Sequence, residues 1–233
     1  MSFGTWTPRH YTDSRGRKLP SATTILSLLD KPALVGWAAK TVTEYVRERA
    51  LGGNGGGPVD RMRLVEILDA APKEWRKVSR KACDIGTTVH GAIETILKGG
   101  REPEAPSPET LAALVAFYEW RDAHALTPLE TEVTVYGNGY AGTADLVAIL
   151  DGKTYLVDFK TSTGIWPENY LQIAAYRAAW NRTHERQIEG HGVLRLDKTT
   201  GKPEWKDASA RFAADYKAFD LLVQFWSLTR GEA

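Results

Sequence analysis

Residues 142–160, GTADLVAILDGKTYLVDFK, form two mostly apolar stretches on either side of DGK, and three charged residues lie within these stretches. Asp145 lies near the start of the first stretch, and Asp158 and Lys160 lie at the end of the second. The surrounding residues are mostly apolar strand formers, as in strands that are buried on both faces. Burying an ionised group costs free energy unless the group is paired or binds a metal. These three residues are therefore the first candidates for chemistry.

The dipeptide DG at residues 151–152 predicts a two-residue hairpin turn between the two stretches. Counting outward from this turn places Asp145 opposite Asp158, whereas a slip of one residue would send the two acids to opposite faces. Opposed carboxylates repel each other unless a positive charge compensates them. Together with the main-chain carbonyl of Phe159 and water, they suit Mg²⁺ or Mn²⁺. The alternative is an ion pair between Asp158 and Lys160, with Asp145 capping a local group.

This arrangement resembles the motifs of the PD-(D/E)XK nuclease superfamily, and most closely those of its RecB-like and phage exonuclease branch. The first acid of the pattern matches Asp145 in GTAD, and the acid–x–lysine element matches residues 158–160. The histidine of the branch matches His90 in IGTTVHGAIE, and its Q-x-x-x-Y element matches Gln172 and Tyr176. All four elements occur in the order that the branch shows.

The resemblance covers roughly residues 84–180 and implies a fold. Two departures, Ala144 in place of the name-giving proline and aspartate as the second acid, are both common in this branch. The expected fold class is α/β (α+β), with a restriction-endonuclease-like core in which helices flank a central mixed β-sheet of about four strands. An N-terminal helical region over residues 1–57, ending in the Gly-rich linker LGGNGGGP, is expected before the nuclease core at 58–233.

The same resemblance implies roles for the matched residues. The groups implied to hold the metal are His90, Asp145, Asp158 and the Phe159 carbonyl. Lys160 would orient the attacking water and stabilise charge that develops on the phosphate. Gln172 and Tyr176 would approach the site and the nucleic-acid backbone, and hydrogen bonding to the sheet edge is the alternative for both.

Two further acids lie near the matched residues in sequence. Glu94 follows His90 by one helical turn and could bind a second metal or orient the histidine, with an exposed acid as the alternative. Glu132, on the strand before Asp145, is expected to be a surface acid.

Residues 61–84 carry seven basic and four acidic side chains. Alone, this pattern is typical of a solvated helix face. Beside a nuclease site it favours contact with DNA phosphates, and the candidates are Trp75, Arg76, Lys77 and Arg80, with Trp75 stacking on a base. Ser21 and Thr23, at an expected helix start, are candidates for holding a terminal phosphate.

The apolar periodicity changes from helical to strand-like after about residue 128. Residues 1–20 are expected to be irregular, with a turn at DSRGRK. The expected elements, in chain order, are helices beginning at Ser21 or Thr23 and at Pro32, helices over 58–70 and 72–97, a helix from 107, strands over 129–137, 140–150 and 153–162, a helix from 167, a fourth strand within 187–202, and a final helix within 207–230.

The composition excludes several classes of protein. Cys83 is the single cysteine, so the chain cannot hold an internal disulfide, a four-cysteine zinc site or a cysteine-ligated iron–sulfur cluster. No apolar run approaches the roughly 20 residues of a membrane helix, and no secretory signal is visible. We expect a cytoplasmic protein, in a bacterial cell or a phage-infected host, with no membrane partner.

The expected activity is hydrolysis of DNA phosphodiester bonds by a Mg²⁺- or Mn²⁺-dependent deoxyribonuclease, and an exonuclease of phage or bacterial recombination, repair or replication is favoured. The alternatives are a structure-specific or sequence-specific endonuclease, a nucleic-acid-binding module without catalysis, and a metal-dependent phosphatase or other hydrolase. The expected partner is single- or double-stranded DNA. Because no helicase motif is present, unwinding or processivity would need a homo-oligomer or a partner recombination or helicase protein.

Overall fold

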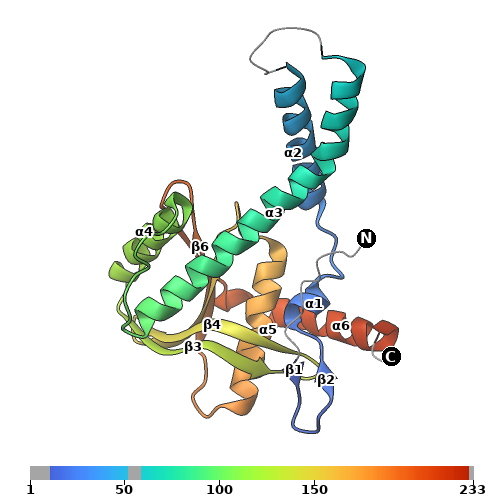
Figure 1. Cartoon of the computed structure of the whole chain (residues 1–233). Helices are drawn as coiled ribbons and strands as arrows, with labels where there is room; N and C mark the ends of the chain where they lie inside the picture. The colour runs from blue at the N-terminus through green and yellow to red at the C-terminus, as the bar shows by residue number, and fades with distance from the viewer. Residues whose placement is uncertain (1–10, 52–58, 231–233) are drawn as a thin grey trace. The chain divides into compact units, whose positions relative to one another are not determined.

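The computed structural model describes residues 11–51 and 59–230, which form two compact units (Figure 1). Residues 30–87 form the smaller unit, and the residues before and after them form the larger one. The Gly-rich linker and the predicted boundary at residue 57 lie outside the described residues. None of the helices in the described ranges is long and apolar enough to cross a membrane.

The smaller unit consists of α2 (Pro32–Leu51) and the first part of α3 (Arg61–Leu97). The prediction of two helices separated near residue 71 was wrong, because α3 continues through Pro72. A proline inside a helix costs about 3 kcal/mol. Burial of Ile67 and Ala71 before the proline, and the contact of Trp75 with Trp37 after it, hold the helix together on both sides.

The larger unit is built on a mixed five-stranded sheet with the order β3-β4-β5-β6-β7. The five strands are β3 (Leu126–Tyr136), β4 (Ala141–Leu150), β5 (Lys153–Lys160), β6 (Gly190–Leu196) and β7 (Pro203–Asp207). Neighbours are antiparallel except β5 and β6, which are parallel and are joined by α5 (Pro167–Thr183). The mixed α/β class is confirmed, and the sheet has one strand more than expected, because a sharp turn returns the chain from β6 into β7.

The segment expected to be irregular contains a short hairpin of β1 (Tyr11–Thr12) and β2 (Lys18–Leu19). The prediction was wrong for residues 11–12 and 18–19, whereas the predicted turn lies between the two strands. The hairpin is closed by Asp13, which accepts hydrogen bonds from the backbone of Arg15 and Arg17. Polar turn residues of this kind favour a hairpin even when the flanking strands are too short to show a period.

The turn at residues 151–152 determines the register of β4 and β5. Asp151 and Gly152 both have positive φ, at 50° and 84°, as a primed hairpin turn requires. The strands pair from Leu150 with Lys153 to Leu146 with Val157, which confirms the predicted register over these residues.

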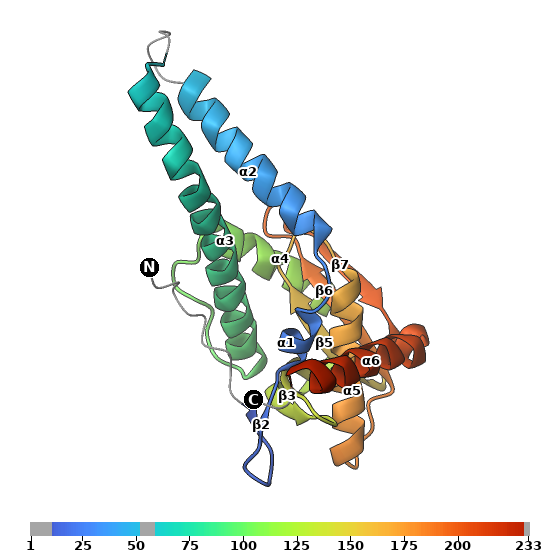
Figure 2. The same cartoon turned by 90° about the vertical axis from the view of Figure 1, so that its right-hand side faces the viewer.

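Helices cover both faces of this sheet (Figures 1 and 2). On one face, Val147 and Leu156 pack in a buried cluster with Ile173 and other residues of α5, together with α1 (Ala22–Leu26) and α6 (Phe212–Arg230). On the other face, Phe117 of α4 (Pro108–Asp122) packs edge-on against Phe159. The sheet is therefore buried on both sides, as the apolar strands predicted, and polar groups within it need partners.

Candidate metal centre

The hairpin of β4 and β5 opens at its end, next to Asp145. The last backbone pair of the ladder is Leu146 with Val157. Beyond this pair, the side chain of Asp145, rather than the backbone of β4, accepts a hydrogen bond from β5. Its Oδ2 accepts a hydrogen bond of 2.7 Å from the backbone N–H of Phe159. The hydrogen bond therefore fixes the carboxylate of Asp145 where the two strands separate. In β5 this point lies between Val157 and Asp158.

His90 reaches this carboxylate from the last part of α3, which belongs to the same unit as the sheet. Its Nδ1 lies 3.4 Å from Asp145 Oδ1. The imidazole also stands edge-on to the ring of Phe159, with the ring centroids 6.0 Å apart. Among the described residues, an aromatic contact and a carboxylate contact thus orient the histidine.

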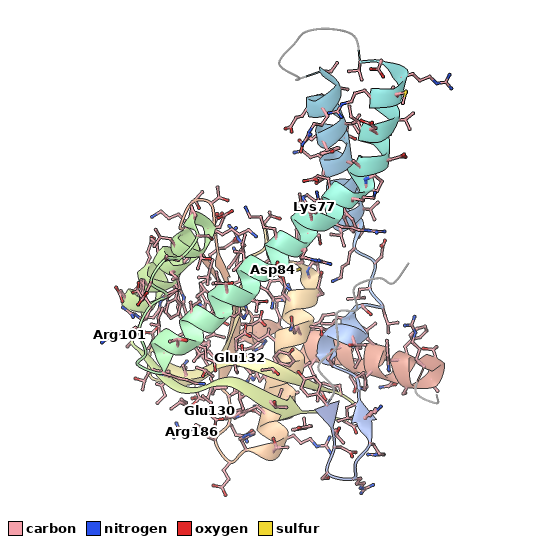
Figure 3. All side chains as sticks on the ribbon, in the orientation of Figure 1. Lys77, Asp84, Arg101, Glu130, Glu132 and Arg186 are labelled. Carbon is pink, nitrogen blue, oxygen red and sulfur yellow. The ribbon has the colours of Figure 1, made fainter. Side chains whose placement is uncertain are left out.

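Glu132 completes a group that the sequence prediction missed. One ligand atom each from His90, Glu132 and Asp145 lies within 4.8 Å of the others. Glu132 is half-buried, so the expectation of a surface acid was wrong. In Figure 3 it lies on β3, beneath α3, whereas Glu130 on the same strand is exposed.

The backbone of Glu132 is in a conformation that few residues other than glycine adopt, with φ at 50°. Its neighbours pair regularly, Thr131 with Leu146 and Val133 with Ala144, so Glu132 stands opposite Asp145. A non-glycine residue at positive φ costs of order 1 kcal/mol or more, and such strain gathers at functional sites. The conformation places Glu132 among the ligand atoms at the opened hairpin.

Asp158 and Lys160 form a buried ion pair beside this group. Lys160 Nζ lies 2.5 Å from Asp158 Oδ2, and the two side chains are 20% and 2% exposed. Both parts of the alternative to a metal site are present: this ion pair, and Asp145 capping a local group, which is the Phe159 N–H. The three-residue group lies beside them and does not include Asp158. Asp158 Oδ2 is buried and, among the described residues, receives no well-directed hydrogen bond.

The charges in this region shift one another's proton affinity. Burial raises the pKa of Asp158 to about 6, and the nearby Asp145 adds to the rise against the effect of Lys160. Burial would also raise the pKa of Asp145, but His90, Lys160 and the Phe159 N–H hold it below its ordinary value. Burial would lower the pKa of Lys160, yet the two aspartates raise it. Lys160 is therefore a fixed cation.

The donor set suits a divalent cation. Two carboxylates, an imidazole and the incompletely satisfied oxygen of Asp158 are oxygen and nitrogen ligands of the kind that Mn²⁺ and Mg²⁺ accept. The residues that would hold the ion are His90, Glu132 and Asp145, with Asp158 next to them. The Phe159 carbonyl as a further ligand stays a prediction.

Gln172 and Tyr176 lie one turn apart on α5 and contact each other. Gln172 Nε2 donates a hydrogen bond of 2.9 Å to the Tyr176 hydroxyl. Tyr176 is only 4% exposed, so its predicted contact with the nucleic-acid backbone was wrong. Its ring packs over Gly142, where a Cβ atom would lie 2.2 Å from it. Gln172 is thus the residue of the pair that is less buried.

The structure gives three other predicted residues local partners. Glu94 pairs with Lys98 at 2.5 Å and is not part of that group. Ser21 is the N-cap of α1, and its hydroxyl contacts those of Thr23 and Thr24 at 2.8 and 2.7 Å. The three hydroxyl groups find hydrogen-bond partners within the first turn of α1, so capping of the helix explains these residues.

The basic candidates for DNA contact belong to the smaller unit. All four lie in α3, where Trp75 packs against Trp37 and Lys77 pairs with Glu74 at 3.2 Å. Arg76 and Arg80 are exposed. Contact of these four residues with DNA stays a prediction.

If His90, Glu132 and Asp145 hold a divalent cation, Mn²⁺ should stabilise the protein, and acid should weaken this effect. Below pH 6, protons compete with the cation for Asp158. Burial would lower the pKa of His90, but Asp145 raises it, and a protonated His90 cannot bind the cation. A hundredfold excess of ion over its dissociation constant adds about 2.7 kcal/mol, which raises Tm by roughly 5–10 °C in a chain of this size. Thermal unfolding at about pH 7.5 and pH 5 measures the difference.

Glu132→Gln should reduce the Mn²⁺ shift strongly, and Glu130→Gln, on the same strand but exposed, is the matched control. A shift that is equal in both variants, or that does not change with pH, would contradict the assignment of the ligands.

The sequence has no match to a family model, and a search of curated proteins gave no significant match.

Proposed function

We propose that the chain is a Mg²⁺- or Mn²⁺-dependent deoxyribonuclease with a PD-(D/E)XK core, acting as an exonuclease in phage or bacterial recombination, repair or replication. One observation carries the proposal: a strand hairpin opens beside a buried Asp–Lys ion pair, where a histidine and two acids converge. Buried ionisable groups with shifted pKa values cluster at functional sites. Two acids and a lysine in this order are also the residues that the superfamily uses.

When bound, a divalent cation in such a site neutralises the scissile phosphate and lowers the pKa of a coordinated water. Asp145 is held for this purpose by the Phe159 N–H, because a carboxylate fixed by a backbone donor cannot rotate away. His90 contacts the other oxygen of the same carboxylate. The two oxygens of Asp145 are thus both oriented before any ligand arrives.

Lys160 supplies positive charge at the reacting phosphate. Its ammonium group stays protonated at neutral pH, since Asp158 and Asp145 raise its pKa against the effect of burial. It is still one-fifth exposed, so it can reach a phosphate oxygen or the attacking water without leaving Asp158. Asp158 therefore has two tasks, which are to hold Lys160 and to offer its remaining lone pairs to the cation.

The proposal is tested by DNA cleavage. End-labelled linear duplex, linear single strand and covalently closed circular DNA are incubated with the protein and Mg²⁺, Mn²⁺ or EDTA. We expect metal-dependent loss of label from the linear substrates and no cutting of the closed circle. Lys160→Ala is expected to remove this activity, because no other buried cation of the described chain contacts Asp158.

Each other result has a definite meaning. Cutting of the closed circle would show an endonuclease on the same site. Absence of cleavage of every DNA, together with retained Mn²⁺ binding, would leave a phosphatase or another hydrolase. Cleavage that Lys160→Ala leaves unchanged would refute the assigned site.

A further inference from the structure

A second feature of the larger unit is an open groove of about 1040 Å³ that contains none of the proposed metal ligands. Its walls are the β1–β2 hairpin, the turn between β3 and β4, the end of α5 and one face of α6. Apolar residues, Leu19, Pro20 and Val223, lie among its lining. The turn comes close to α6, since a Cβ on Gly139 would lie 3.3 Å from Val223.

The lining is strongly basic. Arg15, Arg17, Lys18 and Arg182 line the groove, against a single acid, Asp13. Arg17 pairs with Asp13 at 2.8 Å. The other three basic residues, Arg15, Lys18 and Arg182, are exposed, and within the described ranges they form no ion pair. The chain as a whole carries a net charge of only +1, so this local excess of positive charge marks an anion-binding surface.

Aromatic rings accompany these charges. Tyr136, which is 41% exposed, lines the groove, as does Trp226 of α6, which is half-buried and packs against the core cluster. The guanidinium of Arg230 lies over the Trp226 ring, 5.1 Å from its centroid. Basic side chains that follow a backbone and aromatic rings on which bases stack are the combination by which proteins bind single-stranded nucleic acid.

Strand β4 runs from the edge of the groove to the proposed metal ligand Asp145. The carbonyl of Pro20, at the edge of the groove, accepts a hydrogen bond from Ala141, which begins β4. Four residues along β4, about 13 Å of extended strand, separate Ala141 from Asp145. This distance is one that a few nucleotides of single-stranded DNA would span.

We propose that this groove binds single-stranded DNA adjacent to the cleavage site. The choice of DNA as the ligand rests on the proposed nuclease function. The phosphates contact Arg15, Lys18 and Arg182, and bases stack on Tyr136 and Trp226. The groove therefore holds one strand of the substrate or product while the other end of that strand lies at the metal centre.

Binding in EDTA tests the groove without cleavage. A fluorescein-labelled oligothymidine of about 20 nucleotides is titrated with the full chain, with a variant carrying Arg15→Gln, Lys18→Gln and Arg182→Gln, and with a control carrying Arg101→Gln, Lys153→Gln and Arg186→Gln. The control changes the net charge equally at exposed positions outside the groove lining. We expect the groove variant alone to bind at least about tenfold more weakly near 0.1 M salt, with a log–log salt slope smaller by about 2.

A second variant separates DNA from other polyanions. Tyr136→Ser should weaken binding of the oligothymidine severalfold and leave binding of inorganic polyphosphate unchanged, because only the DNA has bases to stack. Equal losses in the groove and control variants, or an equal effect of Tyr136→Ser on both ligands, would overturn the proposal. Tighter groove-dependent binding of blunt duplex than of the single strand would also overturn it.

The two proposals fail separately. A chain that cleaves DNA with metal but binds the oligothymidine independently of the groove keeps the nuclease function and loses the groove. A chain that cleaves nothing, yet binds the oligothymidine through these residues, keeps the groove and loses the nuclease function.

Discussion

Replacing Asp145 by asparagine is expected to leave the protein folded and to remove its metal-dependent cleavage. The amide oxygen of asparagine can still accept the hydrogen bond that the Phe159 N–H donates to Asp145, so the end of the hairpin keeps its geometry. The charge is lost, and with it the attraction for a cation and for His90. Cleavage should fall by more than about a hundredfold, the upper range for losing a group that only supports a metal ligand.

Three measurements check this expectation. Cleavage of linear DNA gives the loss of activity, the Mn²⁺-induced rise in Tm gives the loss of binding, and the circular dichroism spectrum shows whether the fold is retained. Asp122→Asn is the matched control, because Asp122 is exposed on the surface and pairs only with the neighbouring Arg121 among the described residues. An Asp145→Asn protein that keeps its Mn²⁺ shift would show that the ion is held elsewhere.

The two hairpin turns show how far sequence alone could lead to the site. The DG turn gave the correct register of β4 and β5 from Leu150 with Lys153 to Leu146 with Val157. The ladder ends one pair before Asp145 and Asp158, so their direct pairing stays a prediction. The turn of GNG could have given Glu132 by the same reasoning, since Tyr136 pairs with Ala141 and counting back places Glu132 opposite Asp145. Glu132 was therefore missed although its signal was present in the sequence.

Other features carry no local signal. The Asp145 side chain accepts its hydrogen bond where β4 and β5 separate, and tertiary packing decides where strands separate. The positive φ of Glu132 likewise has no local signal, because glutamate rarely adopts it. The helix through Pro72 depends likewise on the burial of Ile67 and Ala71. The exposed basic groove is formed by four elements distant in sequence, and the hairpin at its edge has strands of only two residues.

The glycine of GTAD gives the second large effect. Gly142 lies in β4 under the ring of Tyr176, and a Cβ there would lie 2.2 Å from a ring carbon and 3.0 Å from the hydroxyl. Real Cβ atoms do not approach so closely, and the Tyr176 ring is buried in the cluster of α5 and the sheet, so it cannot move aside. Gly142→Ala should therefore lower the free energy of unfolding by about 1–3 kcal/mol or more, as overpacking of a core does.

A double-mutant cycle identifies the ring as the cause. Tyr176→Leu removes the atoms that the new methyl group would meet, and it is expected to destabilise the protein by itself, because it leaves a cavity. In the presence of Tyr176→Leu, Gly142→Ala should cost less, with a coupling free energy of about 1 kcal/mol or more from urea unfolding. Additive losses would mean that the backbone of β4, rather than the ring, excludes the methyl group. Because Gly142 precedes Asp145 by three residues and Tyr176 receives the hydrogen bond of Gln172, coupling here would tie the strand that carries the metal ligand to the helix that carries Gln172.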